Sequence, residues 1–265
     1  MWRFIALLLA LVAGIGAAIW YYRSPDAGGG PVRVAARNDD RWIDDLQSRN
    51  PKEVEGATAE VEERGTAALP LIRHTLQDAD APEPRRKAAL KACAMLGARA
   101  SEAVPDIAGL LDDPQYTAEA ALALSFMGSA AVGVLRDAVA DDDAGVRKEA
   151  LRSLGKIRER ASIDPQLVIP ALIDGAADSE PAVREVAVTY LGIVRDSPQK
   201  EVPVLIKALQ DDAPEVRAAA ATALGAYGAD AEAAIPALRK AMTDKDEQVQ
   251  REAGRAVITI SEKRK

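Results

Sequence analysis

The sequence predicts an all-α solenoid of helix pairs, preceded by a single N-terminal transmembrane helix. Three observations support this fold class. A pattern of apolar residues, proline and aspartate recurs along most of the chain. Only 4% of the residues are aromatic although 48% are hydrophobic, which suits closely packed helices better than β-sheets. Near the N-terminus, 19 consecutive residues carry no charge.

The uncharged run at residues 4–22 predicts a membrane anchor over residues 1–23. A helix of this length spans roughly 28 Å, close to the ~30 Å hydrocarbon core of a bilayer. Arg3 and Arg23 bracket the run. A cleaved signal peptide is the alternative, but the run is longer than usual and bulky Trp20 lies where small residues should mark a cleavage site.

Residues 24–41 contain a glycine triplet and two prolines, which predicts a flexible linker. The orientation of the anchor stays open at this point. Counting Lys and Arg on either side favours a cytoplasmic C-terminal part, whereas a three-residue N-terminal tail is common in signal anchors that export the C-terminal part. We expect a single-pass membrane protein whose repeat domain is extracytoplasmic.

The repeat is clearest in residues 201–228, which read as two short amphipathic helices. We expect Pro203 in the first turn of one helix, and Asp212 with Glu215 as the capping box of the next. Gly228 is placed to end that second helix. Prolines occupy the slot of Pro203 at 70, 105, 170, 203 and 236, and Gly133 occupies it once. Two residues later the chain has Ile72, Ile107, Leu135, Leu172, Leu205 and Leu238.

The slot spacings of 35, 28, 37, 33 and 33 residues are those of a helical solenoid. The pattern predicts that residues 42–265 form the solenoid. Its parts are a degenerate first repeat at 42–65, then six repeats at about 68–100, 102–130, 131–160, 167–197, 200–230 and 233–262.

The second helices contain VRKEALRSLG (146–155), VREVAVTYLG (183–192) and VRAAAATALG (216–225). With the leading proline and the turn aspartate, they closely resemble HEAT and HEAT-like (phycobilisome-lyase-type) repeats. The resemblance implies a right-handed superhelix whose second helices line a concave surface. The outer copies depart from the pattern, because Arg85-Arg86, Tyr116-Thr117 and Val249-Gln250 replace Val-Arg.

The repeated arginines and aspartates predict a structural ladder of ion pairs that staples one repeat to the next. Its members are Arg86, Arg147, Arg184, Arg217, Asp78, Asp141, Asp178, Asp211 and Asp244. A row of ligand-binding arginines is the alternative, and nothing adjacent supports it. Gly155, Gly192 and Gly225 lie inside helices, where each costs roughly 1 kcal/mol relative to Ala. We expect a neighbouring helix to approach closely at these glycines.

The sequence predicts no catalytic, metal or cofactor site. His74 is the only histidine and Cys93 the only cysteine, so a catalytic triad or a zinc site lacks its usual residues. We interpret His74 as a surface or groove residue and Cys93 as a core residue. Neither a P-loop nor a dinucleotide fingerprint occurs.

Charge excludes a further class of function. Residues 1–41 carry five Arg and three Asp, a net of +2, so the overall −7 leaves −9 for residues 42–265. This is a poor surface for nucleic acid. We predict a membrane-tethered, non-catalytic protein–protein interaction scaffold that binds a protein or peptide and no small-molecule substrate. The alternative is a lyase-like or accessory subunit that holds a chromophore or substrate for another protein.

Overall fold

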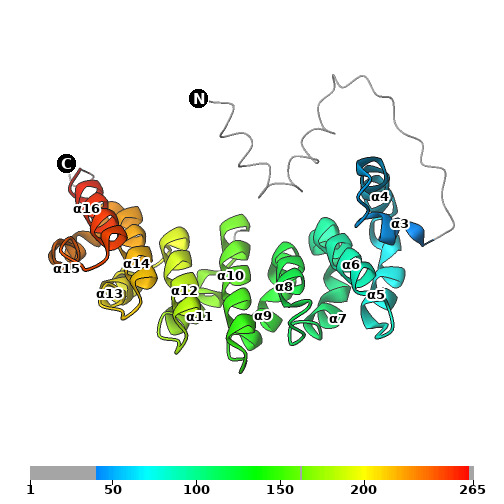
Figure 1. Cartoon of the computed structure of the whole chain (residues 1–265), viewed down its shortest axis with the longest axis horizontal. Helices are drawn as coiled ribbons and strands as arrows, with labels where there is room; N and C mark the ends of the chain where they lie inside the picture. Colours follow the sequence, from blue (N-terminus) through cyan, green and yellow to red (C-terminus); the bar gives the residue numbers. More distant parts are fainter. Residues whose placement is uncertain (1–39, 162, 263–265) are drawn as a thin grey trace, which may run out of the picture.

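The structure is a computed structural model that describes residues 40–161 and 163–262. Within these ranges the chain forms α-helices and short 3₁₀ turns and no β-strand. Consecutive helix pairs stack side by side into a curved row (Figure 1). The prediction of an all-α solenoid is therefore confirmed for this part of the chain.

The first helices of the pairs are α3 (Arg41–Asp45), α5 (Leu69–Gln77), α7 (Val104–Ala108), α9 (Val132–Ala138), α11 (Ile169–Gly175), α13 (Pro198–Ala208) and α15 (Ile235–Ala241). The second helices are α4 (Pro51–Arg64), α6 (Glu83–Leu96), α8 (Thr117–Phe126), α10 (Ala144–Arg160), α12 (Pro181–Val194), α14 (Pro214–Tyr227) and α16 (Glu247–Glu262). The second helices lie along the inner, concave side of the row and the first helices along the outer side (Figure 1).

The repeated apolar slots form the core that joins these helices. In the first helices, six slot residues are completely buried: Ile72, Ile107, Leu135, Leu172, Leu205 and Leu238. In the second helices, Cys93, Leu124, Leu154, Leu191 and Leu224 are equally buried. One continuous hydrophobic cluster contains both sets, so each pair buries its apolar faces against its neighbours.

Glycines set the spacing of the second helices where the sequence predicts close approach. A Cβ atom added at Gly192 would lie 2.6 Å from the Cβ and 2.7 Å from the Cα of Ala223 on the next second helix. At Gly225 the nearest atoms would be those of Ala256, at 3.2 and 3.3 Å. At Gly155 the added atom would lie 2.1 Å from the ring of Tyr190. The helices therefore stack with almost no side chain between them at Gly192 and Gly225, whereas Gly155 makes room for the Tyr190 ring.

Two local expectations are wrong. Pro203 lies inside α13 because that helix already begins at Pro198. The capping box of Asp212 and Glu215 does not form, because the N-cap of α14 is Ala213 and its backbone N–H bonds to the Asp211 carboxylate at 2.9 Å. Gly228 ends α14 as expected, with a positive φ of 59° that favours glycine.

The predicted membrane localisation requires correction. Among the described helices, none is long and apolar enough to cross a bilayer. The prediction of a single-pass membrane protein with an extracytoplasmic repeat domain is contradicted by this finding. The predicted anchor at residues 4–22 and the linker at 24–41, apart from its last two residues, lie outside the described residues.

The glycine contacts predict that two Gly→Ala substitutions change the stability of the protein in opposite directions. Gly192→Ala should destabilise the protein by about 1–3 kcal/mol, because the new methyl overlaps the backbone of Ala223. Gly254→Ala, inside α16, should stabilise it by up to about 1 kcal/mol, because nothing lies within 4 Å of the new atom. Denaturant unfolding of both variants checks this. Equal effects would show that the helices stack in another register.

Candidate functional site

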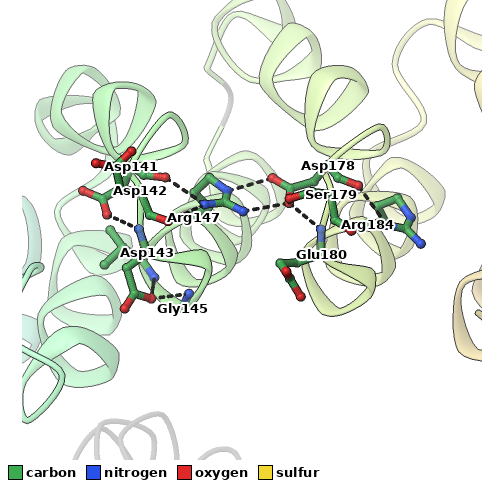
Figure 2. Close-up of polar contacts among 10 residues, drawn as sticks. Asp141, Asp142, Asp143, Gly145, Arg147, Asp178, Ser179, Glu180 and Arg184 are labelled. Atoms are coloured by element: carbon green, nitrogen blue, oxygen red, sulfur yellow. Dashed lines mark hydrogen bonds and ion pairs between the residues drawn. The ribbon is translucent and has the colours of Figure 1, made fainter.

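Arg147 shows how one repeat is joined to the next (Figure 2). Its Nε and Nη2 donate to the two carboxylate oxygens of Asp178, in the following repeat, at 2.7 and 2.8 Å. Its Nη1 donates to the backbone carbonyls of Asp141 and Asp142, in its own repeat, at 2.8 and 3.0 Å. One guanidinium therefore holds two successive interhelical turns together.

The same geometry recurs twice towards the C-terminus. Arg184 donates through Nε and Nη2 to Asp211 at 2.7 and 2.8 Å, and Arg217 donates likewise to Asp244 at 2.8 and 2.7 Å. Each Nη1 bonds two carbonyls of its own turn. The structure thus brings three of the predicted arginines onto the aspartate of the next repeat.

Backbone N–H groups of their own turns also donate hydrogen bonds to these aspartates. One carboxylate oxygen of Asp178 accepts the backbone N–H of Glu180 at 2.8 Å, and Asp244 accepts that of Asp246 at 2.9 Å. Hydrogen bonding from the arginine lowers the pKa of both Asp178 and Asp244 below the ordinary value. Burial alone would raise the pKa of Asp211, but hydrogen bonds from Arg184 and the backbone leave that pKa lowered.

The ladder does not include every residue predicted for it. The guanidinium of Arg86 lies 5.5 Å from the ring centroid of Tyr116, and its Nε has no hydrogen-bond partner among the described residues. The carboxylate of Asp78 bonds only the N–H of Asp80, and that of Asp141 only the N–H of Asp143, within the described part. The ladder therefore runs from the Asp141 turn to the Asp244 turn.

Two substitutions in the arginine slot keep only the contact to their own turn. Thr117 Oγ1 donates to the carbonyl of Leu111 at 2.8 Å, and Gln250 Nε2 donates to that of Asp244 at 2.6 Å. Both acceptors lie six residues earlier, as for the arginines. Because Gln250 stands in the last described repeat, no further turn lies within the described residues for it to reach.

The ladder is occupied by its own contacts and is not a ligand site. All three guanidinium nitrogens of Arg147, Arg184 and Arg217 already donate. The two other residues considered in the sequence, His74 and Cys93, do not belong to the ladder. His74 is exposed on α5, beside Arg73, and Cys93 is buried, where burial raises the pKa of its thiol to about 12. The described residues contain no group of three metal-binding side chains.

The repeat register instead defines a candidate interaction surface on the second helices. Positions one, five and nine residues after the arginine slot lie one helical turn apart and are exposed or partly exposed except at Ala218. We call them the concave positions. From α6 to α16 they are Lys87, Lys91, Met95; Ala118, Leu122, Phe126; Lys148, Arg152, Lys156; Glu185, Thr189, Ile193; Ala218, Thr222, Ala226; and Arg251, Arg255, Thr259.

The concave positions of α12 and α14 line an open groove, and α16 contributes Gln248 and Glu252 to it. The groove has a volume of about 590 Å³. It is lined by small residues such as Ala218 and Thr222, by the apolar Ile193, and by the carboxylates of Glu185 and Glu252. A groove of this shape and size can accept side chains of a bound polypeptide.

Sequence reasoning missed the concave positions, although the signal was available. The arginine slot fixes the angular register of each second helix, and counting one, five and nine residues onward selects its solvent-facing stripe. The buried slots hold similar residues in every repeat, whereas the concave positions change from cationic to apolar to small. Only the packing of α12, α14 and α16 shows that the stripes of α12 and α14, together with Gln248 and Glu252 of α16, form a groove.

Comparisons with known proteins agree with this geometry. Residues 169–258 match the family model of HEAT repeats. The chain is 26% identical to a chain of the complex of CpcE and CpcF of phycocyanin lyase from Nostoc sp. PCC7120, covering 58% of this chain and 98% of that one with a TM-score of 0.51. No curated protein sequence matches the chain significantly.

Two further structures share the fold. An engineered protein is 22% identical, with 84% of this chain and 96% of that one covered and a TM-score of 0.50. Importin beta is 15% identical with a TM-score of 0.60, and the match covers 83% of this chain but only 33% of importin beta. The repeat domain described here is therefore HEAT-like, a fold typical of protein-interaction scaffolds.

The ladder geometry predicts a large effect of a single arginine. Arg184→Ala should lower the unfolding free energy by about 2–3 kcal/mol, because it leaves the Asp211 carboxylate and two carbonyls without their charged donor. Arg136→Ala, on an exposed residue of α9, is the control and should stay within about 0.5 kcal/mol. Equal losses in urea unfolding would contradict the stapling role.

The lowered pKa values of Asp178, Asp211 and Asp244 predict an acid dependence. A carboxyl whose pKa is lower in the folded state stabilises the fold above its unfolded pKa of about 3.9, and that contribution is lost as the pH falls through the folded value. Urea unfolding between pH 7 and 2 should therefore show stability falling below about pH 4. Asp244→Asn should flatten this dependence, and an unchanged slope would count against it.

Proposed function

We propose that this protein is a non-catalytic scaffold that binds a protein or peptide partner along the concave positions. The observation that carries the proposal is the open groove lined by α12, α14 and α16. Six of its twelve lining residues are the concave positions of α12 and α14, which vary between repeats, while the residues that build the core are repeated. A surface that varies on a constant frame suits recognition of an extended partner.

Several features support the non-catalytic part of the proposal. The buried Cys93 thiol, with its raised pKa, is protonated at neutral pH and therefore a poor nucleophile. His74 lines a separate open pocket on the outer side, together with Arg73, Gln77 and Glu102, and no serine or cysteine lines that pocket. The carboxylates of the ladder are held by arginines and cannot act as free bases.

A lyase-like or accessory role is the second candidate. It is favoured by one observation, the 26% identity that extends over 98% of a chain of the phycocyanin lyase complex. In this case the same groove would hold a chromophore or substrate for another protein. Visible absorbance that co-purifies with the native chain and disappears in a groove variant would favour this role over simple scaffolding.

Filling the groove tests the proposal. Thr222→Trp places a large side chain on the exposed face of α14 inside the groove and should lower capture of native partners about tenfold or more. The control is Lys207→Trp on the exposed side of α13. Full-length chains are used as bait in extracts of the source cells, and bound proteins are quantified by mass spectrometry. Thermal melting verifies that both variants fold.

Two results would sink the proposal. One is that the native chain captures nothing beyond the background of beads without bait. The other is that Thr222→Trp and Lys207→Trp capture the same partners to the same extent, because a partner on the concave positions must sense only the first substitution.

A further inference from the structure

The concave positions of α10 form the most cationic stripe of the inner surface. Lys148, Arg152 and Lys156 follow one another at intervals of four residues, and Arg160 continues the stripe by one more turn. This stripe belongs to a part of the chain whose net charge is −9. Its neighbours in the stack, α8 and α12, have no Lys or Arg at their concave positions.

Tyr190 of α12 lies against this stripe. Its ring packs directly on the backbone of Gly155, where a Cβ atom would come within 2.1 Å of the ring. Burial raises the pKa of its hydroxyl, and the charges that act on it are Arg152, Glu159, Arg160 and Glu149, all of α10. The hydroxyl therefore lies among the α10 charges and adds a hydrogen-bond donor to them.

The members of this cluster differ in how their polar groups are satisfied. Arg152 pairs with Glu149 at 2.6 Å, and the guanidinium of Arg160 lies 4.3 Å from the ring centroid of Phe126. In contrast, the ammonium of Lys156 and the hydroxyl of Tyr190 bond to no other described residue. Both side chains are partly buried, and burial lowers the pKa of Lys156. Arg160 and Arg152 lower this pKa further, while Glu149 and Glu159 act in the opposite direction.

The cations on the solvated face of α16 differ from Lys156 of α10, because they are paired with carboxylates and more exposed. On α16, Arg251 pairs with Glu247 and Arg255 pairs with Glu252, with 57% and 72% of the two arginine side chains exposed. Those cations need no further partner. Lys156 is less exposed, lacks a carboxylate within 4 Å among the described residues and lies near two other cations. An anionic group bound there would therefore relieve repulsion as well as gain hydrogen bonds.

The concave positions that lie nine residues after the arginine slot define the surroundings of that anion. Along the stack this row reads Met95, Phe126, Lys156, Ile193 and Ala226. A chain that crosses α8, α10 and α12 along this row therefore meets an apolar residue, a cation and an apolar residue. Packed helices lie about 8–10 Å apart, and an extended chain advances about 3.3 Å per residue, so successive contacts fall about three residues apart.

We propose that Lys156 and Tyr190 bind the carboxylate of one Asp or Glu in an extended segment of the protein partner. Apolar residues about three positions before and after this carboxylate contact Phe126 and Ile193. The inference rests on the proposed function, since it names the partner chemistry for the same concave surface. A nucleic acid fits less well, because its row of phosphates needs many clustered cations, whereas residues 42–265 carry a net charge of −9.

The test uses a fluorescent peptide with a single Asp and a Leu three positions before and after it, and a matched peptide with Asn in place of Asp. Binding to the full-length chain is measured by fluorescence anisotropy. The Asp peptide should bind about tenfold or more tightly than the Asn peptide. Lys156→Gln should remove this difference, and Tyr190→Phe, which keeps the ring on Gly155, should reduce it.

Lys207→Gln on α13 makes the same change in net charge at an exposed outer site and should leave the difference between the peptides intact. The proposal is overturned if neither peptide binds, if both bind equally, or if Lys156→Gln and Lys207→Gln have equal effects. Displacement of the Asp peptide by millimolar inorganic phosphate as well as by unlabelled peptide would show a bare anion site and would also overturn it.

The two proposals can fail separately. If native partners are lost with Thr222→Trp but the two peptides bind alike, the scaffold function stands and the acidic-segment inference fails. If the peptides behave as expected but no native partner depends on the groove, the proposed scaffold function of the groove fails, while the preference of Lys156 and Tyr190 for a carboxylate stands.

Discussion

The fold depends on one constraint, which is that no helix pair in this chain can bury its own apolar faces. Each second helix must pack against the second helices before and after it, and it must do so closely. Gly192 against Ala223 and Gly225 against Ala256 show how closely, since a single added methyl at Gly192 would overlap the neighbouring backbone. This requirement explains why Ala and Leu dominate the core and aromatic residues are few.

Close apolar stacking fixes the distance between repeats but leaves their relative orientation loosely defined, since small residues can slide. The ladder supplies the orientation. A guanidinium has a planar fork of donors, so Arg184 can bond the Asp211 carboxylate through two nitrogens and its own turn through the third, which lysine cannot do. Thr117 is too short for the second contact, and no described arginine reaches the Asp141 carboxylate, so the ladder does not join the α7–α8 pair to the α9–α10 pair. A hydrogen bond from Ser153 Oγ to the carbonyl of Ala121 at 2.8 Å joins these pairs instead.

Most of the fold could be predicted because its cause is repeated. Leu205 and Leu224 occupy slots that recur with the same chemistry, so six imperfect copies reveal what one copy would not. What failed was local. The N-cap position of α14 is Ala213 and not Asp212, and the backbone N–H of Ala213 bonds to the Asp211 carboxylate. The complete burial of Glu201 beneath the Tyr227 hydroxyl has no precedent in the other repeats, and the concave groove arises only from the stacking of three helices.

The division of labour between slots has a consequence for recognition. Because the core and the ladder use fixed positions, the concave positions can change without loss of stability, and each repeat contributes one chemically distinct stripe. A row of apolar side chains gives contact area but little discrimination between partners, since many segments carry apolar residues. One partly buried cation in that row changes this. A partner with a neutral side chain at this place would leave the Lys156 ammonium shielded from water and without a partner, so the cation rejects wrong partners more strongly than it favours right ones.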